Sequence, residues 1–258
     1  MPMKLTVSIL LLLLATLFVA AGPAQSTRAA DTPSAEITGE VALVEGSAQK
    51  NLQGNPQGKS ARASDASQVV IWLVPIEPIQ HIRTTPEKTH YRLVQRNKRF
   101  EPSLLVIPVG SIVDFPNADP WFHNVFSLYR GKRFDLGLYQ AGAQRSVRFD
   151  RPGPSYLFCN IHPEMTGVVL AIDSDLFAIS DKAGHYSISG VPPGKYLIRV
   201  WYENARPESL QELQRTTTIE GSNHALSTIS VPVFTQVATE HKNKYNQDYD
   251  PDTLRPDY

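Results

Sequence analysis

The shortness of its apolar runs most limits what this chain can fold into. Beyond the first 24 residues, the runs that suit strands have three to eight residues and end at glycine, proline or small polar residues. The 20 prolines and 15 glycines also favour short strands and turns over long helices. We therefore predict an all-β protein made of β-sandwiches. The predicted strands are 37–44, 69–74, 104–109, 111–115, 125–129, 146–149, 156–158, 167–172, 186–188, 196–201, 216–219 and 228–233.

The charge balance limits the kind of partner. Lysine plus arginine and aspartate plus glutamate both number 25, so the formal net charge is zero. Binding to nucleic acid through bulk positive charge is therefore not expected. The 258 residues are enough for one large domain or two small ones.

The N-terminus has the pattern of an export signal. Lys4 precedes an almost continuous apolar stretch over residues 5–21, and small residues follow it. We predict a cleaved signal peptide over 1–24, a flexible lead over 25–35, and a periplasmic or secreted protein with no stable membrane span after cleavage. An uncleaved anchor is the alternative. No cysteine follows the apolar stretch, which excludes a lipoprotein anchor.

One short segment carries three soft or borderline metal donors. Cys159, His162 and Met165 stand at three-residue steps between two predicted strands. Cys159 is the only cysteine, and Met165 is the only methionine beyond the predicted signal. Another histidine, His123, lies upstream just before a predicted strand. Two histidines and a cysteine with a weak axial methionine form the ligand set of a blue-copper site.

Other interpretations of these residues remain. Each taken alone is more often an ordinary core side chain. Zinc is the rival ion, although a thioether is a poor zinc ligand and structural zinc sites use more thiolates. A catalytic Cys–His pair is a further rival, but no orienting Asn or Asp signature accompanies it. The combination favours copper, with one ion bound.

The region from about residue 97 to 172 resembles a cupredoxin, and its ligand loop is similar to that of amicyanin. The resemblance rests on the Cys-x-x-His-x-x-Met spacing, on Asn124 after His123 and on Pro163 after His162. It implies a Greek-key β-sandwich over 88–173. It also implies a copper site held by His123, Cys159, His162 and Met165, with Asn124 tethering the ligand loop. Glu164 stands where amicyanin has an apolar residue.

A second resemblance covers the rest of the chain. The motifs Asp-x-x-Gly at 181–184 and Pro-Pro-Gly-x-Tyr at 192–196 resemble the transthyretin-like sandwich of the carboxypeptidase regulatory-like family. We expect residues 36–76 and 174–234 to form this sandwich, with the cupredoxin inserted between its halves. A separate N-terminal hairpin is the alternative. Residues 235–258 are expected to be a loose tail.

The leading functional hypothesis is an exported one-electron carrier, not an enzyme, with an unidentified redox partner protein. His162 is the expected exit route for the electron, and Trp121, Phe122 and Phe158 are expected to shield the site. A copper-binding or delivery protein without a redox role is one alternative. An adhesion or scaffold protein built on the sandwiches is another.

Overall fold

The structure is a computed structural model that describes residues 34–46, 65–79, 90–128, 131–234, 243–245 and 247–248. Over these residues the chain is all-β, as predicted, and its one helix is the short α1 (Pro207–Glu212). The predicted signal peptide and residues 25–33 of the predicted flexible lead lie outside this part of the chain, as do residues 47–64. None of the helices described is long and apolar enough to span a bilayer.

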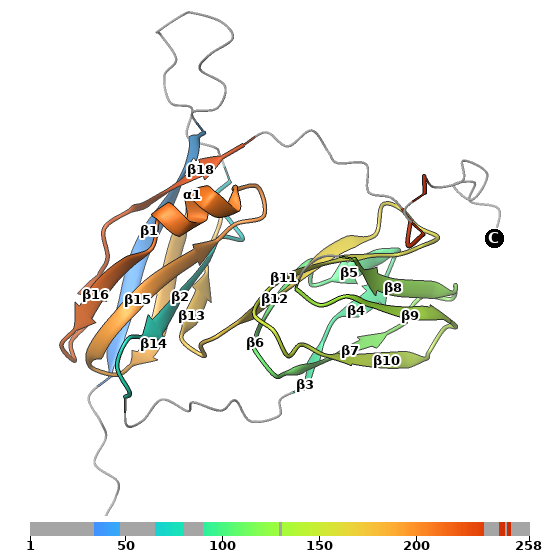
Figure 1. Ribbon diagram of the computed structural model, residues 1–258, viewed down its shortest axis with the longest axis horizontal. Helices are drawn as coiled ribbons and strands as arrows, with labels where there is room; N and C mark the ends of the chain where they lie inside the picture. The colour runs from blue at the N-terminus through green and yellow to red at the C-terminus, as the bar shows by residue number, and fades with distance from the viewer. Residues whose placement is uncertain are drawn as a thin grey trace, which may run out of the picture. The chain divides into compact units, whose positions relative to one another are not determined.

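The first sandwich has two sheets of four strands each (Figure 1). In one sheet β1 pairs antiparallel with β14 and parallel with β17 and β18. In the other sheet the order is β13-β2-β15-β16, with antiparallel neighbours. The strands are β1 (Ala35–Glu45), β2 (Val70–Pro75), β13 (Phe177–Ile179), β14 (His185–Val191), β15 (Gly194–Trp201), β16 (Arg215–Ile219), β17 (His224–Ala225) and β18 (Ile229–Val233).

Strand pairing in this sandwich joins distant parts of the sequence. Both early strands, β1 and β2, pair only with strands that follow residue 176. They lie in different sheets and form no hairpin with each other. Val70 shares a sheet with Val200, whereas Val41 lies in the opposite sheet. The chain thus leaves this sandwich after β2 and returns to it at β13.

The core of the first sandwich follows the period-two pattern of its strands. In β15 the side chains of Tyr196, Ile198 and Val200 alternate inward and are buried. In β2 the four residues 70–73 are all buried, as expected for an apolar run covered on both faces. At about 25 cal/mol per Å² of apolar surface, this burial is the main stabilising contribution.

Gly184 closes the turn before β14 and supports the first sandwich. Its φ is +88°, and a Cβ atom there would lie 2.2 Å from the carbonyl oxygen of Val41. The same two residues form a backbone hydrogen bond of 2.8 Å from the Val41 N–H to the Gly184 carbonyl. We expect Gly184→Ala to lower the free energy of unfolding by more than about 2 kcal/mol, since backbone strain and a steric clash add.

Gly190 provides the matched control for this prediction. Its φ is +72°, but no atom lies within 4 Å of a Cβ built there. Gly190→Ala therefore isolates the backbone strain, which amounts to about 1 kcal/mol. Chemical denaturation of both variants measures the difference, and equal losses would show that the approach of Gly184 to Val41 is unimportant.

The second sandwich contains the strands from residue 90 to 172. A five-stranded sheet has the order β6-β12-β11-β8-β9, a three-stranded sheet has the order β10-β7-β3, and β4 and β5 form a hairpin. The strands are β3 (His90–Arg92), β4 (Val94–Arg96), β5 (Arg99–Glu101), β6 (Leu104–Pro108), β7 (Ile112–Pro116), β8 (His123–Ser127), β9 (Phe134–Tyr139), β10 (Gln144–Arg148), β11 (Gly153–Phe158) and β12 (Thr166–Ile172).

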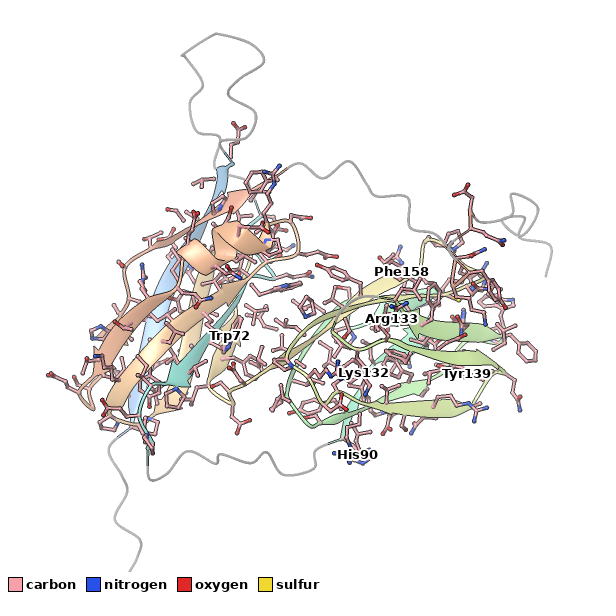
Figure 2. All side chains as sticks on the ribbon, in the orientation of Figure 1. Trp72, His90, Lys132, Arg133, Tyr139 and Phe158 are labelled. Carbon is pink, nitrogen blue, oxygen red and sulfur yellow. The ribbon has the colours of Figure 1, made fainter. Side chains whose placement is uncertain are left out.

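A separate aromatic and aliphatic core fills this sandwich. Its buried members include Val113, Phe115, Phe149, Leu157 and Val169, together with Cys159 and Met165. Figure 2 labels Trp72 in the first sandwich, and Tyr139 and Phe158 in the second.

Sequence patterns missed β9 and the five short strands β3, β4, β5, β13 and β17. Strand β9 lies at a sheet edge and carries Gly137 at a φ of +66°, so its alternation of buried and exposed residues is weak. The short strands have only two or three residues each, which is too few for a periodic signal.

Candidate metal centre

The hairpin of β11 and β12 forms the loop that carries three of the four predicted ligands. In its register, Phe158 pairs with Thr166. The next positions, Cys159 and Met165, therefore face each other where the loop begins and ends. The loop closes on itself through a 3.0 Å hydrogen bond from the Met165 N–H to the His162 carbonyl.

Strand β8 brings the fourth predicted ligand beside this loop. Phe126 of β8 pairs with Phe158 of β11, so the start of β8, His123, lies near Cys159. His123 and Cys159 are fully buried, whereas His162 is half-buried. The donor atoms of these three residues all lie within 4.8 Å of one another.

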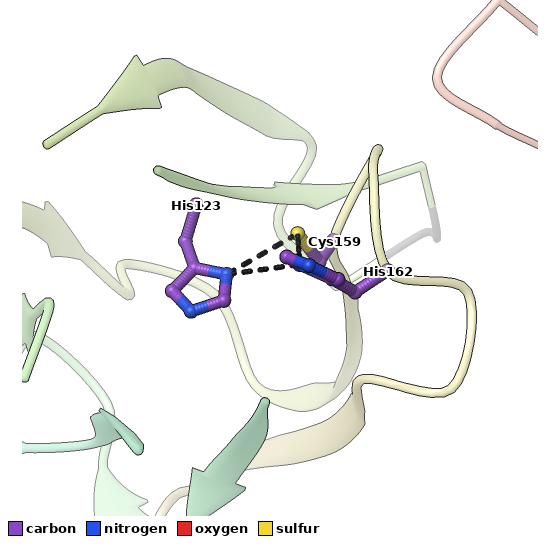
Figure 3. A group of neighbouring side chains, drawn as sticks. All are labelled: His123, Cys159 and His162. Carbon is purple, nitrogen blue, oxygen red and sulfur yellow. Dashed lines mark hydrogen bonds between the residues drawn. The ribbon is translucent and has the colours of Figure 1, made fainter. Parts of the chain in front are cut away.

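The two imidazole rings present the same nitrogen to the sulfur (Figure 3). The Cys159 Sγ atom lies 3.9 Å from His123 Nδ1 and 3.7 Å from His162 Nδ1. The two Nδ1 atoms are 3.1 Å apart. Three donor atoms thus converge on one point from two segments that are distant in sequence.

Asp119 fixes the protonation of the His123 ring. Its carboxylate oxygen lies 2.8 Å from His123 Nε2, and a carboxylate can only accept a hydrogen bond. His123 Nε2 therefore carries the proton, and in the neutral ring the Nδ1 lone pair is directed at Cys159 and His162. A carboxylate that orients a histidine in this way is the usual outer support of a metal-binding histidine.

Burial of Asp119 is compensated by strong hydrogen bonds. Its side chain also accepts the backbone N–H groups of Asn97 at 2.6 Å and Lys98 at 2.9 Å. Burial raises the pKa of Asp119, but these N–H groups and His123 outweigh burial, so the net pKa is lowered. The carboxylate is therefore ionised at neutral pH and remains an acceptor.

Burial shifts the pKa values of the donor groups, and for the two histidines the shift favours the form that binds a metal. Burial lowers the pKa of both His123 and His162, which favours neutral rings with free lone pairs. Burial raises the pKa of the Cys159 thiol, although the backbone N–H groups of Asn124, Ile161 and His162 oppose this by facing the sulfur. A cation in the cluster would release the thiol proton.

The structure tests several further expectations about the site. Met165 is fully buried in the same core cluster as Cys159. The side chain of Asn124 donates to Asp135 of β9 at 2.7 Å and not to the ligand loop, and its Oδ1 atom is buried without a hydrogen-bond partner in the described part of the chain. The side-chain tether expected of Asn124 is therefore not direct, and only its backbone N–H faces the loop, at Cys159.

The expected aromatic shield is only partly present. Phe158 is buried and packs against Phe126 with ring centroids 5.8 Å apart. Trp121 is half-buried, with the ammonium of Lys98 5.2 Å from its ring centroid. Phe122 is 55% exposed and does not shield the site. It turns outward because the next residue, His123, points into the core and side chains of an extended chain alternate.

Asp119 is the functional residue that sequence reasoning missed. It stands four residues before His123, but that spacing brings the two together only because Asn117 folds the intervening loop. Asn117 accepts the Asp119 N–H at 3.0 Å and donates to the Trp121 carbonyl at 2.7 Å. The sequence offered only the nearness of an acidic residue to a candidate histidine ligand.

Comparison with known proteins gives only distant matches. No family model and none of the curated proteins compared matches the chain. Solved structures similar to part of it include a purple cupredoxin from Nitrosopumilus maritimus, with 24% identity, a TM-score of 0.30, and coverage of 32% of this chain and 99% of that one. A tryptophan-to-tyrosine mutant of amicyanin has 21% identity, a TM-score of 0.31, and coverage of 32% of this chain and 82% of its own.

A Cu-containing nitrite reductase from Thermus scotoductus is also similar. It shares 23% identity with a TM-score of 0.32, over 37% of this chain and 25% of its own.

Proposed function

We propose that the protein is an exported blue-copper protein that carries single electrons. The observation that carries the proposal is the convergence of the His123 and His162 Nδ1 atoms on the Cys159 sulfur, with His123 Nε2 bonded to Asp119. Copper is the ion that a thiolate and two imidazoles favour when a thioether, here from Met165, completes the set. Bound there, it would supply a one-electron couple that no side chain of the site supplies.

The arrangement of the donors favours electron transfer over delivery of the metal. The three donor atoms converge within 4.8 Å of one another, and His123, Cys159 and Met165 are buried in the core. A rigid, pre-arranged set needs little movement when the charge at its centre changes by one. A delivery site needs donors that a second protein can reach, and here only His162 is partly exposed.

Each residue has a defined part in this role. Cys159 and the two histidines bind the ion, and Asp119 holds the His123 ring. The apolar core around Met165 excludes water, and the half-buried His162 gives an electron its shortest way to a redox partner protein. The proposed role does not include catalysis, since a donor set supplied entirely by the protein leaves no position for a substrate.

Repeated oxidation and reduction tests this function. Copper-loaded protein is reduced with ascorbate and reoxidised with ferricyanide in the presence of a Cu(I) chelator. We expect the visible band to disappear and return over several cycles with the copper retained. Loss of the metal to the chelator at the first reduction would contradict the carrier role and favour copper delivery. The Cys159→Ser variant is the control that should give no band.

A further inference from the structure

The C-terminal residues Asn243, Lys244 and Tyr245, here called the clasp, reach the loop that carries three of the candidate ligands through Lys244. The clasp forms a turn of its own, in which Asn243 Oδ1 accepts the N–H groups of Tyr245 at 2.9 Å and Gln247 at 3.0 Å. The Asn243 N–H donates to the Gln247 carbonyl at 2.8 Å. Because these bonds fix the turn locally, Lys244 at its tip is presented in one orientation. Of the loose tail expected over 235–258, the structure describes residues 243–245 and 247–248, and the others lie outside the described residues.

Lys244 binds two different elements of the second sandwich. Its backbone N–H donates to Asn160 Oδ1 at 3.1 Å, and Asn160 lies in the ligand loop between Cys159 and His162. Its ammonium donates to Asp135 Oδ2 in β9 at 2.9 Å. One residue thus joins the ligand loop to a strand more than twenty residues before it.

The Asp135 carboxylate extends this connection to the other ligand-bearing segment. Its Oδ1 atom accepts the side-chain amide of Asn124 at 2.7 Å and the Gly137 N–H at 2.9 Å. Asn124 directly follows His123 in β8. A continuous chain of hydrogen bonds therefore runs from the loop of Cys159 and His162, through Lys244 and Asp135, to the strand of His123.

We infer that the clasp is a positioning element of the metal centre and that Lys244 is its central residue. A metal centre retains its geometry only when the segments that carry its donors are held by outer contacts. The loop over 159–165 is held from within by the Met165 N–H, which donates to the His162 carbonyl, and by the N–H groups of Ile161 and His162, which face the Cys159 sulfur. Lys244 supplies an outside support for it. The inference rests on the proposed function only for the identity of the metal.

Hydrogen exchange of the metal-free full chain tests the clasp without copper. We expect Lys244→Met to raise the exchange rate of amides in the 160–165 segment by about threefold, the effect of a partly exposed ion pair. Deletion of residues 243–258 also removes the hydrogen bond to Asn160 and should raise the exchange rate of these amides by about tenfold. Lys244→Arg keeps the charge and the donors and should restore rates within about twofold of wild type.

The control and the second readout separate the clasp from the copper proposal. Lys195→Met removes an exposed lysine of β15 and should leave loop exchange unchanged. In copper-loaded protein, Lys244→Met and the deletion should accelerate loss of the ion to a chelator in the same order. Unchanged loop exchange in both variants would overturn the clasp, even with normal copper binding. Faster exchange would support it, even if the wild type bound no copper.

Discussion

Replacement of Cys159 by alanine is expected to lower the affinity for copper by more than about 100-fold. Loss of a residue that only hydrogen-bonds to a metal ligand already lowers the affinity by up to about 100-fold, and loss of a ligand itself should lower it further. The thiolate is the one charged donor in the cluster, and its sulfur lies within 3.9 Å of both Nδ1 atoms. A neutral methyl group there leaves two imidazoles and a thioether, a much weaker set. Competition with a calibrated copper chelator measures the change.

Cys159→Ser is the matched variant for this prediction. It keeps the size of the side chain but replaces a soft sulfur by a hard hydroxyl oxygen, so we expect nearly the same loss of affinity for Cu(I). Both metal-free variants should fold, because replacement of one small buried side chain costs about 1 kcal/mol. Retained affinity in both folded variants would show that the sulfur is not a ligand.

Asp119→Asn is expected to weaken copper binding by about 10- to 100-fold and to raise the reduction potential. The carboxylate holds the proton on His123 Nε2, and its negative charge favours the more positive oxidation state of a bound ion. An asparagine oxygen accepts more weakly and carries no charge. Each tenfold shift in preference for the reduced state corresponds to about 59 mV. Spectroelectrochemical titration measures the potential, and chelator competition measures the affinity.

Asp150→Asn is the control for the loss of one negative charge in the same sandwich. Asp150 is exposed and pairs with Lys132 at 2.9 Å, away from the cluster. We expect the reduction potential of the Asp150→Asn variant to stay close to that of the wild type, since exposed charges are screened. Equal shifts in the two variants would mean that Asp119 acts through net charge alone and not through the His123 ring.

Much of the candidate site could be predicted from sequence because its geometry is local. Cys159, His162 and Met165 share one loop, and two predicted strands on either side imply a hairpin that brings its ends together. His123 was identifiable because Asn124 follows it and a predicted strand begins at residue 125. The all-β class followed from short runs bounded by proline and glycine, and the structure has two sandwiches.

The parts that could not be predicted depend on contacts between distant residues. Asp119 reaches His123 only through the loop that Asn117 folds, and no periodic pattern signals such a loop. Lys244 binds Asp135 and Asn160, which lie 109 and 84 residues away in the sequence. Strand β9 was missed because an edge strand with an internal glycine has no clear alternation.

The absorption and electron spin resonance spectrum of the full chain after addition of one equivalent of Cu(II) tests the central claim most directly. We predict an intense visible band from thiolate-to-copper charge transfer and the small copper hyperfine splitting of a blue-copper site. His123→Ala, measured beside the wild type, should lose this spectrum. A colourless wild-type protein, or a blue His123→Ala variant, would contradict the assignment of His123, Cys159 and His162 as one copper site.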